Sequence, residues 1–174
     1  MGVFVSAAFA AVNRIDDFAY IPQQNIAHAM TALMAQNKGA KKTNRIKAAF
    51  LCGIKIELIY GIFIFLLCFF LAHPLMQLFS SDPVVCKHGV TYLKLISLMY
   101  LFPAVTNGVQ GYFRGIGDLK ITLISSFVNM SVRVIFAAIL VFHFSLQIEA
   151  LPFSYLAGWI GMLVAEIPLL LKKF

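Results

Sequence analysis

Charged residues are scarce in this sequence. Of its 174 residues, 12% are Asp, Glu, Lys or Arg and 61% are hydrophobic, whereas soluble globular domains are about 45–50% apolar. A soluble domain of this length could not bury apolar runs such as 58–71 and 134–142 without leaving large exposed patches. The composition therefore excludes an ordinary soluble domain. It predicts that the chain is embedded in a lipid bilayer, which is thus a partner of the protein.

Cysteines and catalytic motifs are also few. The three cysteines include no C-x-x-C pair, and Cys52 and Cys68 fall within apolar runs, where a thiol usually behaves as a small hydrophobic side chain. The four histidines are scattered, and no metalloprotease or serine-hydrolase motif is present. These absences argue against a disulfide framework, a metal site, a cofactor and catalytic residues, so we predict that the protein is not an enzyme.

Basic residues outnumber acidic ones, with a formal net charge of +7, but their positions do not indicate a nucleic-acid partner. Nine of the fourteen Lys and Arg lie beside apolar segments, in the stretches 38–47, 114–120 and 172–173. By the positive-inside rule, these stretches face the cytoplasm. The sequence therefore predicts a multi-pass membrane protein whose carboxy terminus is cytoplasmic and whose amino terminus is outside.

Five apolar segments predict an all-α, polytopic membrane protein that forms a single membrane domain over residues 1–174. They cover about 3–35, 46–72, 89–112, 121–143 and 151–171. Each is long enough to cross about 30 Å of hydrocarbon at about 1.5 Å per residue. Pro22 should bend or break the first segment, and Pro103 the third, because proline removes a backbone hydrogen bond. An outside amino terminus with an odd number of helices is an awkward state for insertion, so we expect further helices upstream.

Glu57, near the midpoint of the second segment, is the first candidate for function. A charge at the centre of a membrane helix costs about 2.5–3.5 kcal/mol on insertion scales, so it requires a partner or a water-filled cavity. Two interpretations stay open: Glu57 takes up a proton or a sodium ion and competes with a cationic substrate, or it pairs with a buried cation. Arg133, with Asn129 one turn earlier on the same face, is the obvious partner. We favour a structural role for Arg133, because guanidinium is always charged and carries protons poorly.

Further acidic residues give weaker candidates. Arg14 and Asp17 are three residues apart on one predicted helix and can form an ion pair across a turn. Asp16 is then left without a local partner, either lining a central cavity or exposed to water at the interface. Glu166, near the inner end of the last segment, is expected to be solvated or paired.

Polar residues lie near two of the intramembrane prolines, Pro22 and Pro103. Asn107 and Gln110 come after Pro103, and other amides lie around Pro22. Prolines free backbone carbonyls, which together with amides can bind cations or let a helix bend between two states. Hydrogen-bonded packing between helices is the more common use of such residues.

Three stretches, taken in order, resemble the multidrug and toxic compound extrusion (MATE) family. They are Asn13-Arg14-Ile15 followed by Pro22, then 35–40 (AQNKGA) ending in Arg45, and then 111–118 (GYFRGIGD) before a helix with Asn129 and Arg133. The resemblance covers nearly the whole chain and corresponds to the last five of the family's twelve helices. It implies two six-helix lobes around a central cavity, with this chain forming most of the second lobe. The missing amino-terminal helices of the same transporter would be its partner.

The resemblance also implies a function. The family exports small cationic, amphipathic organic compounds, such as drugs and toxins, in exchange for sodium or protons by alternating access. For this chain it implies a place in the plasma membrane, the inner membrane of a bacterium. In some members, acidic residues on the first and fourth helices of this lobe help to bind the cation or the substrate; the first helix is absent here, and 89–112 has no Asp or Glu.

Two other functions stay open. The wider superfamily includes flippases for lipid-linked oligosaccharides, whose cavities are more cationic, and Arg14 and Arg133 fit that pattern. The chain is also compatible with an inactive membrane fragment that serves only a structural role.

Overall fold

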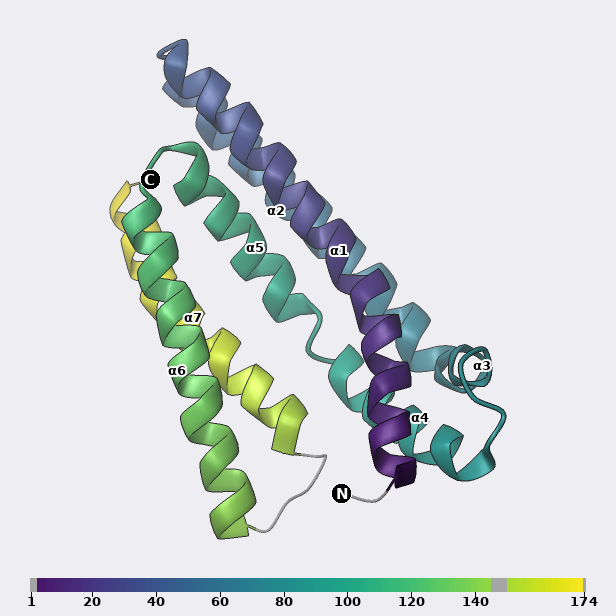
Figure 1. Ribbon diagram of the computed structural model, residues 1–174. Helices are drawn as coiled ribbons and strands as arrows, with labels where there is room; N and C mark the ends of the chain where they lie inside the picture. Colours follow the sequence, from purple (N-terminus) through teal and green to yellow (C-terminus); the bar gives the residue numbers. More distant parts are fainter. Residues whose placement is uncertain (1–2, 145–149, 174) are drawn as a thin grey trace.

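The computed structural model describes residues 3–144 and 150–173, and every secondary-structure element within these ranges is an α-helix (Figure 1). The helices are α1 (Val3–Gly39), α2 (Thr43–Phe70), α3 (Ala72–Gln77), α4 (Pro83–Ser97), α5 (Leu101–Gly115), α6 (Leu119–Phe144) and α7 (Ala150–Lys173). The prediction of an all-α fold is confirmed for these residues. α1, α2 and α5 run side by side, and α6 packs chiefly on α7.

Three helices, α2, α6 and α7, are long and apolar enough to cross a membrane. α4 and α5 together meet the same test as one span bent by 47°, which gives a fourth. Among the described residues, α1 is long enough but does not meet the same test; Arg14, Asp16 and Asp17 lie in its first half, and polar residues surround Pro22 in its second. The predicted number of five spans is therefore a proposal, taken up below.

α1 continues through Pro22, so of the two outcomes expected of this proline, a bend or a break, the break does not occur. Ala19, Gln23 and Ala27 are buried at four-residue intervals around the proline. This face packs against α2 and α5, and we attribute the continuity of α1 to that packing, which offsets the one backbone hydrogen bond that proline removes. The alternative was a bend, and the ribbon of α1 does change direction along its length (Figure 1).

The third predicted segment is broken, as expected from Pro103. α4 ends at Ser97 and α5 begins at Leu101, with a turn between them. Pro103 lies in the first turn of α5, where a missing N–H group costs little. A side chain also binds at the break: the buried side chain of Gln23 donates a hydrogen bond of 3.3 Å from Nε2 to the carbonyl oxygen of Tyr100. An amide of α1 therefore stabilises the point at which the span changes direction.

The segment before this span is more helical than predicted. Residues 73–88 were expected to form a loop, but they contain α3 and the start of α4. Asp82 begins α4 as its N-cap, because its carboxylate accepts hydrogen bonds from the amides of Val84 (2.7 Å) and Val85 (3.3 Å). Pro83 occupies the next position, where its fixed φ suits a helix start.

The third predicted segment ends at residue 112, but α5 extends into the glycine-rich stretch 111–118 as far as Gly115. Gly111 and Gly115 let α5 approach the backbone of α1 closely, at Ala27 and Thr31. The turn itself is confined to the residues before α6, where Gly117 has φ +79°, a conformation that glycine adopts without strain.

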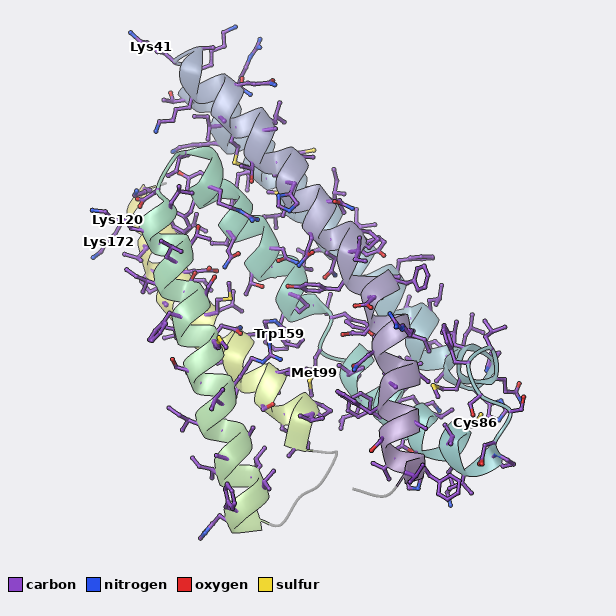
Figure 2. The ribbon with its side chains drawn as sticks, viewed as in Figure 1. Lys41, Cys86, Met99, Lys120, Trp159 and Lys172 are labelled. Atoms are coloured by element: carbon purple, nitrogen blue, oxygen red, sulfur yellow. The ribbon has the colours of Figure 1, made fainter. Side chains whose placement is uncertain are left out.

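The three predicted cationic stretches meet at one end of the bundle. Lys41, Lys120 and Lys172 lie toward the same end in Figure 2. Lys38 donates a hydrogen bond to the carbonyl of Ile116, and Lys173 forms an ion pair with Asp118. The hairpin between α1 and α2, the turn between α5 and α6, and the end of α7 are thereby brought together, as the positive-inside rule requires of stretches on one side of a membrane.

Candidate functional site

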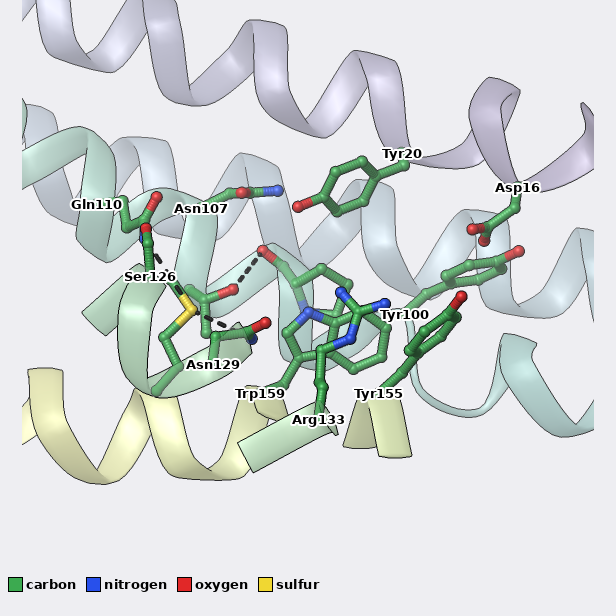
Figure 3. A pocket seen from close by; sticks show the side chains of 13 residues that line it. Asp16, Tyr20, Tyr100, Asn107, Gln110, Ser126, Asn129, Arg133, Tyr155 and Trp159 are labelled. Atoms are coloured by element: carbon green, nitrogen blue, oxygen red, sulfur yellow. Dashed lines mark hydrogen bonds between the residues drawn. The ribbon is translucent and has the colours of Figure 1, made fainter. Parts of the chain in front are cut away.

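A cavity of about 310 Å³ lies among α1, α5, α6 and α7 (Figure 3). Polar and aromatic side chains line it in an otherwise apolar bundle. They are Asp16 and Tyr20 from α1; Tyr100 from the turn before α5; Pro103, Thr106, Asn107 and Gln110 from α5; Ser126, Asn129 and Arg133 from α6; and Tyr155, Trp159 and Met162 from α7. Six of the ten residues singled out from the sequence, Asp16, Asn107, Gln110, Asn129, Arg133 and Pro103, are thereby brought together.

Each helix contributes one face to this cavity. The lining residues recur at intervals of three, four or seven: 16 and 20, 103 to 110, 126 to 133, and 155 to 162. These are the intervals at which helical residues share a face. The sequence analysis missed the aromatic members Tyr20, Tyr100, Tyr155 and Trp159. The spacing of Tyr155, Trp159 and Met162 in α7, which mirrors the spacing in α6, is the signal that would have found two of these aromatic residues.

Arg133 projects from α6 into the cavity (Figure 3). Its guanidinium carbon lies 4.0 Å from the centroid of the Tyr155 ring, a distance at which cation and ring attract each other. Its aliphatic stem lies against Gly158, because a Cβ atom added there would stand 2.8 Å from Cδ of Arg133. The glycine directly before Trp159 thus makes room for the arginine.

Amide side chains converge on Met162 at another part of the wall. The Nε2 group of Gln110 lies 3.4 Å from Oγ of Ser126 and 4.0 Å from the sulfur of Met162, and Nδ2 of Asn129 lies 3.6 Å from the same sulfur. Thioether sulfur is a weak acceptor, so these amides keep most of their hydrogen-bonding capacity for a bound molecule. The Nδ2 group of Asn107 is buried and has no hydrogen-bond partner in the described structure.

Asp16 is the one carboxylate on the cavity wall. Figure 3 shows it facing the hydroxyl ends of Tyr100 and Tyr155. It lies within electrostatic range of Arg133 without forming an ion pair with it. Negative and positive charge therefore line the same cavity, with aromatic rings between them.

Glu57 lies outside this cavity. Its side chain is 0% exposed, and neither carboxyl oxygen accepts a hydrogen bond from any residue that the structure describes. Of the two interpretations left open for Glu57, the structure does not show the ion pair with Arg133. Glu57 is one turn from Gly61, whose neighbours are Gln23 of α1 and Ala104 of α5, so it faces the α1–α5 side of the bundle. No pattern in the sequence indicates which face of α2 is buried there.

Arg14, Asp17 and Pro22 also lie away from the cavity wall. Arg14 and Asp17 are exposed on α1 and form no ion pair with each other, so that prediction is wrong as well. An exposed pair gains little from pairing, since holding two side chains in one geometry costs entropy. Pro22 is partly buried within α1.

Glu166 is the acidic residue that the sequence analysis placed wrongly. It was expected to be solvated or paired, but its side chain is 0% exposed and forms no ion pair within the described residues. It lies one turn beyond Met162 in α7, and its polar neighbours are Ser125 of α6 and Gln110 and Arg114 of α5. α7 therefore buries a second carboxyl group beside the cavity, on the side of the cationic end. Among the described residues, no group of three His, Cys, Asp or Glu side chains lies close enough together to hold a metal ion.

Comparison with known proteins decides the family. Residues 1–139 match the family described as MatE. The chain belongs to the MatE family. Because members of this family are transporters, the assignment agrees with the prediction that the protein is not an enzyme.

Curated relatives of this MatE chain include transport proteins of bacteria. The probable multidrug resistance protein NorM of Thermotoga maritima is 25% identical over 154 residues, which is 88% of this chain and 32% of the relative. The FAD transporter of Shewanella oneidensis is 28% identical over 121 residues, 67% of this chain and 27% of the relative. The chain thus spans about a third of the length of the curated relatives it matches.

Solved structures agree on the fold. The MATE transporter ClbM in complex with Rb+ superposes with a TM-score of 0.90 at 17% identity, over 98% of this chain and 39% of that one. A MATE structure in the bent conformation superposes with a TM-score of 0.92 at 13% identity, over 99% of this chain and 38% of that one. The fold of this MatE chain is therefore that of a part of these transporters.

Proposed function

We propose that the intact protein exports amphipathic organic compounds with a cationic group in exchange for sodium or protons. The observation that carries this proposal is the polar and aromatic cavity among four helices of an apolar bundle. Groups of this kind have no stabilising role in contact with lipid, and in membrane proteins they mark substrate pathways. Relatives named as multidrug resistance proteins support the proposal.

The cavity wall suggests how such a compound is bound. The rings of Tyr20, Tyr155 and Trp159 offer apolar faces to a flat aromatic molecule, and aromatic faces also attract organic cations. Asp16 supplies the carboxylate for the cationic group. This wall is one side of a central cavity, whose other side we assign to the amino-terminal helices of the same transporter.

Two buried carboxyl groups are candidates for coupling. Glu57 and Glu166 are each 0% exposed and form no ion pair in the described structure, and Glu57 accepts no hydrogen bond there either. A carboxyl group in this setting is costly unless it binds a proton or a cation. We propose that one of them binds the coupling ion, sodium or a proton, and that its loading favours release of the organic compound by alternating access.

We further propose five membrane spans: α1, α2, α4 with α5, α6 and α7. They would form most of the second lobe of a two-lobed transporter in the plasma membrane of a bacterium. The end that carries Lys41, Lys120 and Lys172 would face the cytoplasm, together with the carboxy terminus.

Transport from liposomes tests this function. The intact protein is reconstituted, a lipophilic cationic dye is enclosed, and a sodium or proton gradient is imposed. Efflux that follows the gradient supports the proposal. Either Glu57→Gln or Glu166→Gln should abolish the dependence on the gradient, whereas Asp118→Asn, at the exposed end of the bundle, should keep it. Efflux at the rate of protein-free liposomes contradicts export, and transport of a lipid-linked oligosaccharide instead would indicate a flippase.

A further inference from the structure

Arg133 has no ion-paired or hydrogen-bonded partner within the described structure. Its guanidinium forms no ion pair with Asp16 or Glu57 and donates no hydrogen bond to any described residue. A guanidinium group stays charged under all conditions that a protein experiences, and a charge in a membrane protein calls for a partner. The N–H groups of Arg133 are therefore available to an anionic group of a bound molecule.

The geometry prepares Arg133 for a planar anion. The guanidinium carbon lies 4.0 Å from the ring centroid of Tyr155, and the stem is confined against Gly158. The contact with the ring uses no hydrogen bond, so the N–H edges of the guanidinium stay available. Those edges are the part that binds a carboxylate through two parallel hydrogen bonds.

We infer that Arg133 is an anchor for the carboxylate of an aromatic cargo, so that the transporter prefers aromatic compounds with a carboxylate over the same compounds without one. This inference rests on the proposed function. Asp16 lies in the same cavity without pairing to Arg133, so one molecule can present its cationic group to Asp16 and its carboxylate to Arg133. Trp159, also on the wall, offers a further surface for the ring system between them.

A matched pair of dyes tests the inference. Tetramethylrhodamine carries a carboxylate, and its methyl ester has the same ring system and the same cationic group without the anion. Binding of each dye to the intact protein in detergent is measured by fluorescence anisotropy. The wild-type protein should bind the carboxylate at least about tenfold more tightly than the ester, the scale expected of a charge-assisted bidentate hydrogen bond.

Variants assign this preference to Arg133. Arg133→Gln should remove the preference: its affinity for the carboxylate dye should fall about tenfold or more, and its affinity for the ester should stay within about twofold of the wild type. Arg133→Lys should keep only part of the preference, because an ammonium lacks the planar fork. Arg14→Gln, which removes a guanidinium from outside the cavity, is the matched control and should bind both dyes as the wild type does. Retained ester binding in Arg133→Gln also shows that the variant is folded.

Three results overturn the inference: equal affinity of the wild type for both dyes, binding of neither dye, or equal weakening of both dyes by Arg133→Gln. The same dyes in the liposome assay separate this outcome from failure of the proposed function. Gradient-driven efflux of both dyes at equal rates would support the export function and contradict the role of Arg133 as a carboxylate anchor. Selective binding of the carboxylate dye without gradient-driven efflux would support the role of Arg133 and contradict export.

Discussion

The backbone of α5 at Gly111 lies directly against α1 at Ala27, since a Cβ atom on Gly111 would stand 2.8 Å from the carbonyl oxygen of Ala27. No side chain can move aside there, because the neighbouring atom belongs to the backbone. Small residues at such crossings allow membrane helices to approach closely. This contact holds the cavity-lining helix α5 against α1.

Gly111→Ala should therefore destabilise the protein. The helices must separate to accept the methyl group, and overpacking of this kind costs about 1–3 kcal/mol. Gly39→Ala makes the same chemical change where nothing lies within 4 Å, so it should leave stability unchanged or slightly higher. Thermal unfolding in detergent checks both; equal midpoints for the two variants would mean that the close crossing contributes nothing.

Tyr155 should support binding at Arg133 through its ring rather than its hydroxyl. Tyr155→Leu removes the ring whose centroid lies 4.0 Å from the guanidinium carbon. Because a cation–π contact contributes about 0.5–2 kcal/mol, its loss should lower the affinity for the carboxylate dye several-fold. Tyr155→Phe keeps the face and should change the affinity by less than about twofold. Anisotropy titrations measure both variants, and a loss of affinity in Tyr155→Phe as large as that in Tyr155→Leu would show that the hydroxyl is the important group.

The buried carboxyl group of Glu57 should destabilise the protein. Its carboxyl group is fully buried and accepts no hydrogen bond in the described structure, and an unsatisfied buried polar group costs about 1–3 kcal/mol. Glu57→Met, which has a similar length and no polar oxygen, should raise the thermal midpoint, and Glu57→Gln should raise it less. A lower midpoint for Glu57→Met would reveal a stabilising partner for the carboxylate.

The orientation of the bundle gives a separate prediction. In a variant whose native cysteines are replaced, Lys41→Cys at the cationic end should react with a membrane-impermeant maleimide only after the cells are opened. Ser81→Cys, between α3 and α4 and far from the cationic end, should react in intact cells. The reverse pattern would contradict the positive-inside assignment, and reaction of both in intact cells would contradict an odd number of spans between them.

The sequence predicted the helices well because their signal is local. Apolar segments of spanning length and the cationic stretches between them are visible in the sequence, and the structure brings those stretches to one end. Boundaries were less accurate where a local cap decides them. Asp82 and Pro83 were interpreted as loop residues, although an acidic N-cap followed by proline is a helix start.

The site was predicted in part, for a physical reason. Arg133 and Asn129 share a helix face and reach the cavity together, which their spacing indicates. Glu57 and Glu166 could not be placed, since the side on which a helix is buried depends on how other helices pack. Both carboxyl groups lie in segments that are apolar almost all round, where the sequence offers no polar face to orient them.

Protection of the cavity from chemical labelling tests the central claim most directly. In the intact protein without native cysteines, a single cysteine replaces either Gln110 on the cavity wall or Leu123 on the exposed side of α6, and its rate of reaction with a permeant maleimide is measured with and without tetramethylrhodamine. The account predicts that the dye slows labelling at position 110 at least several-fold and leaves position 123 unchanged. Labelling at position 110 that proceeds at the same rate under saturating dye would contradict it.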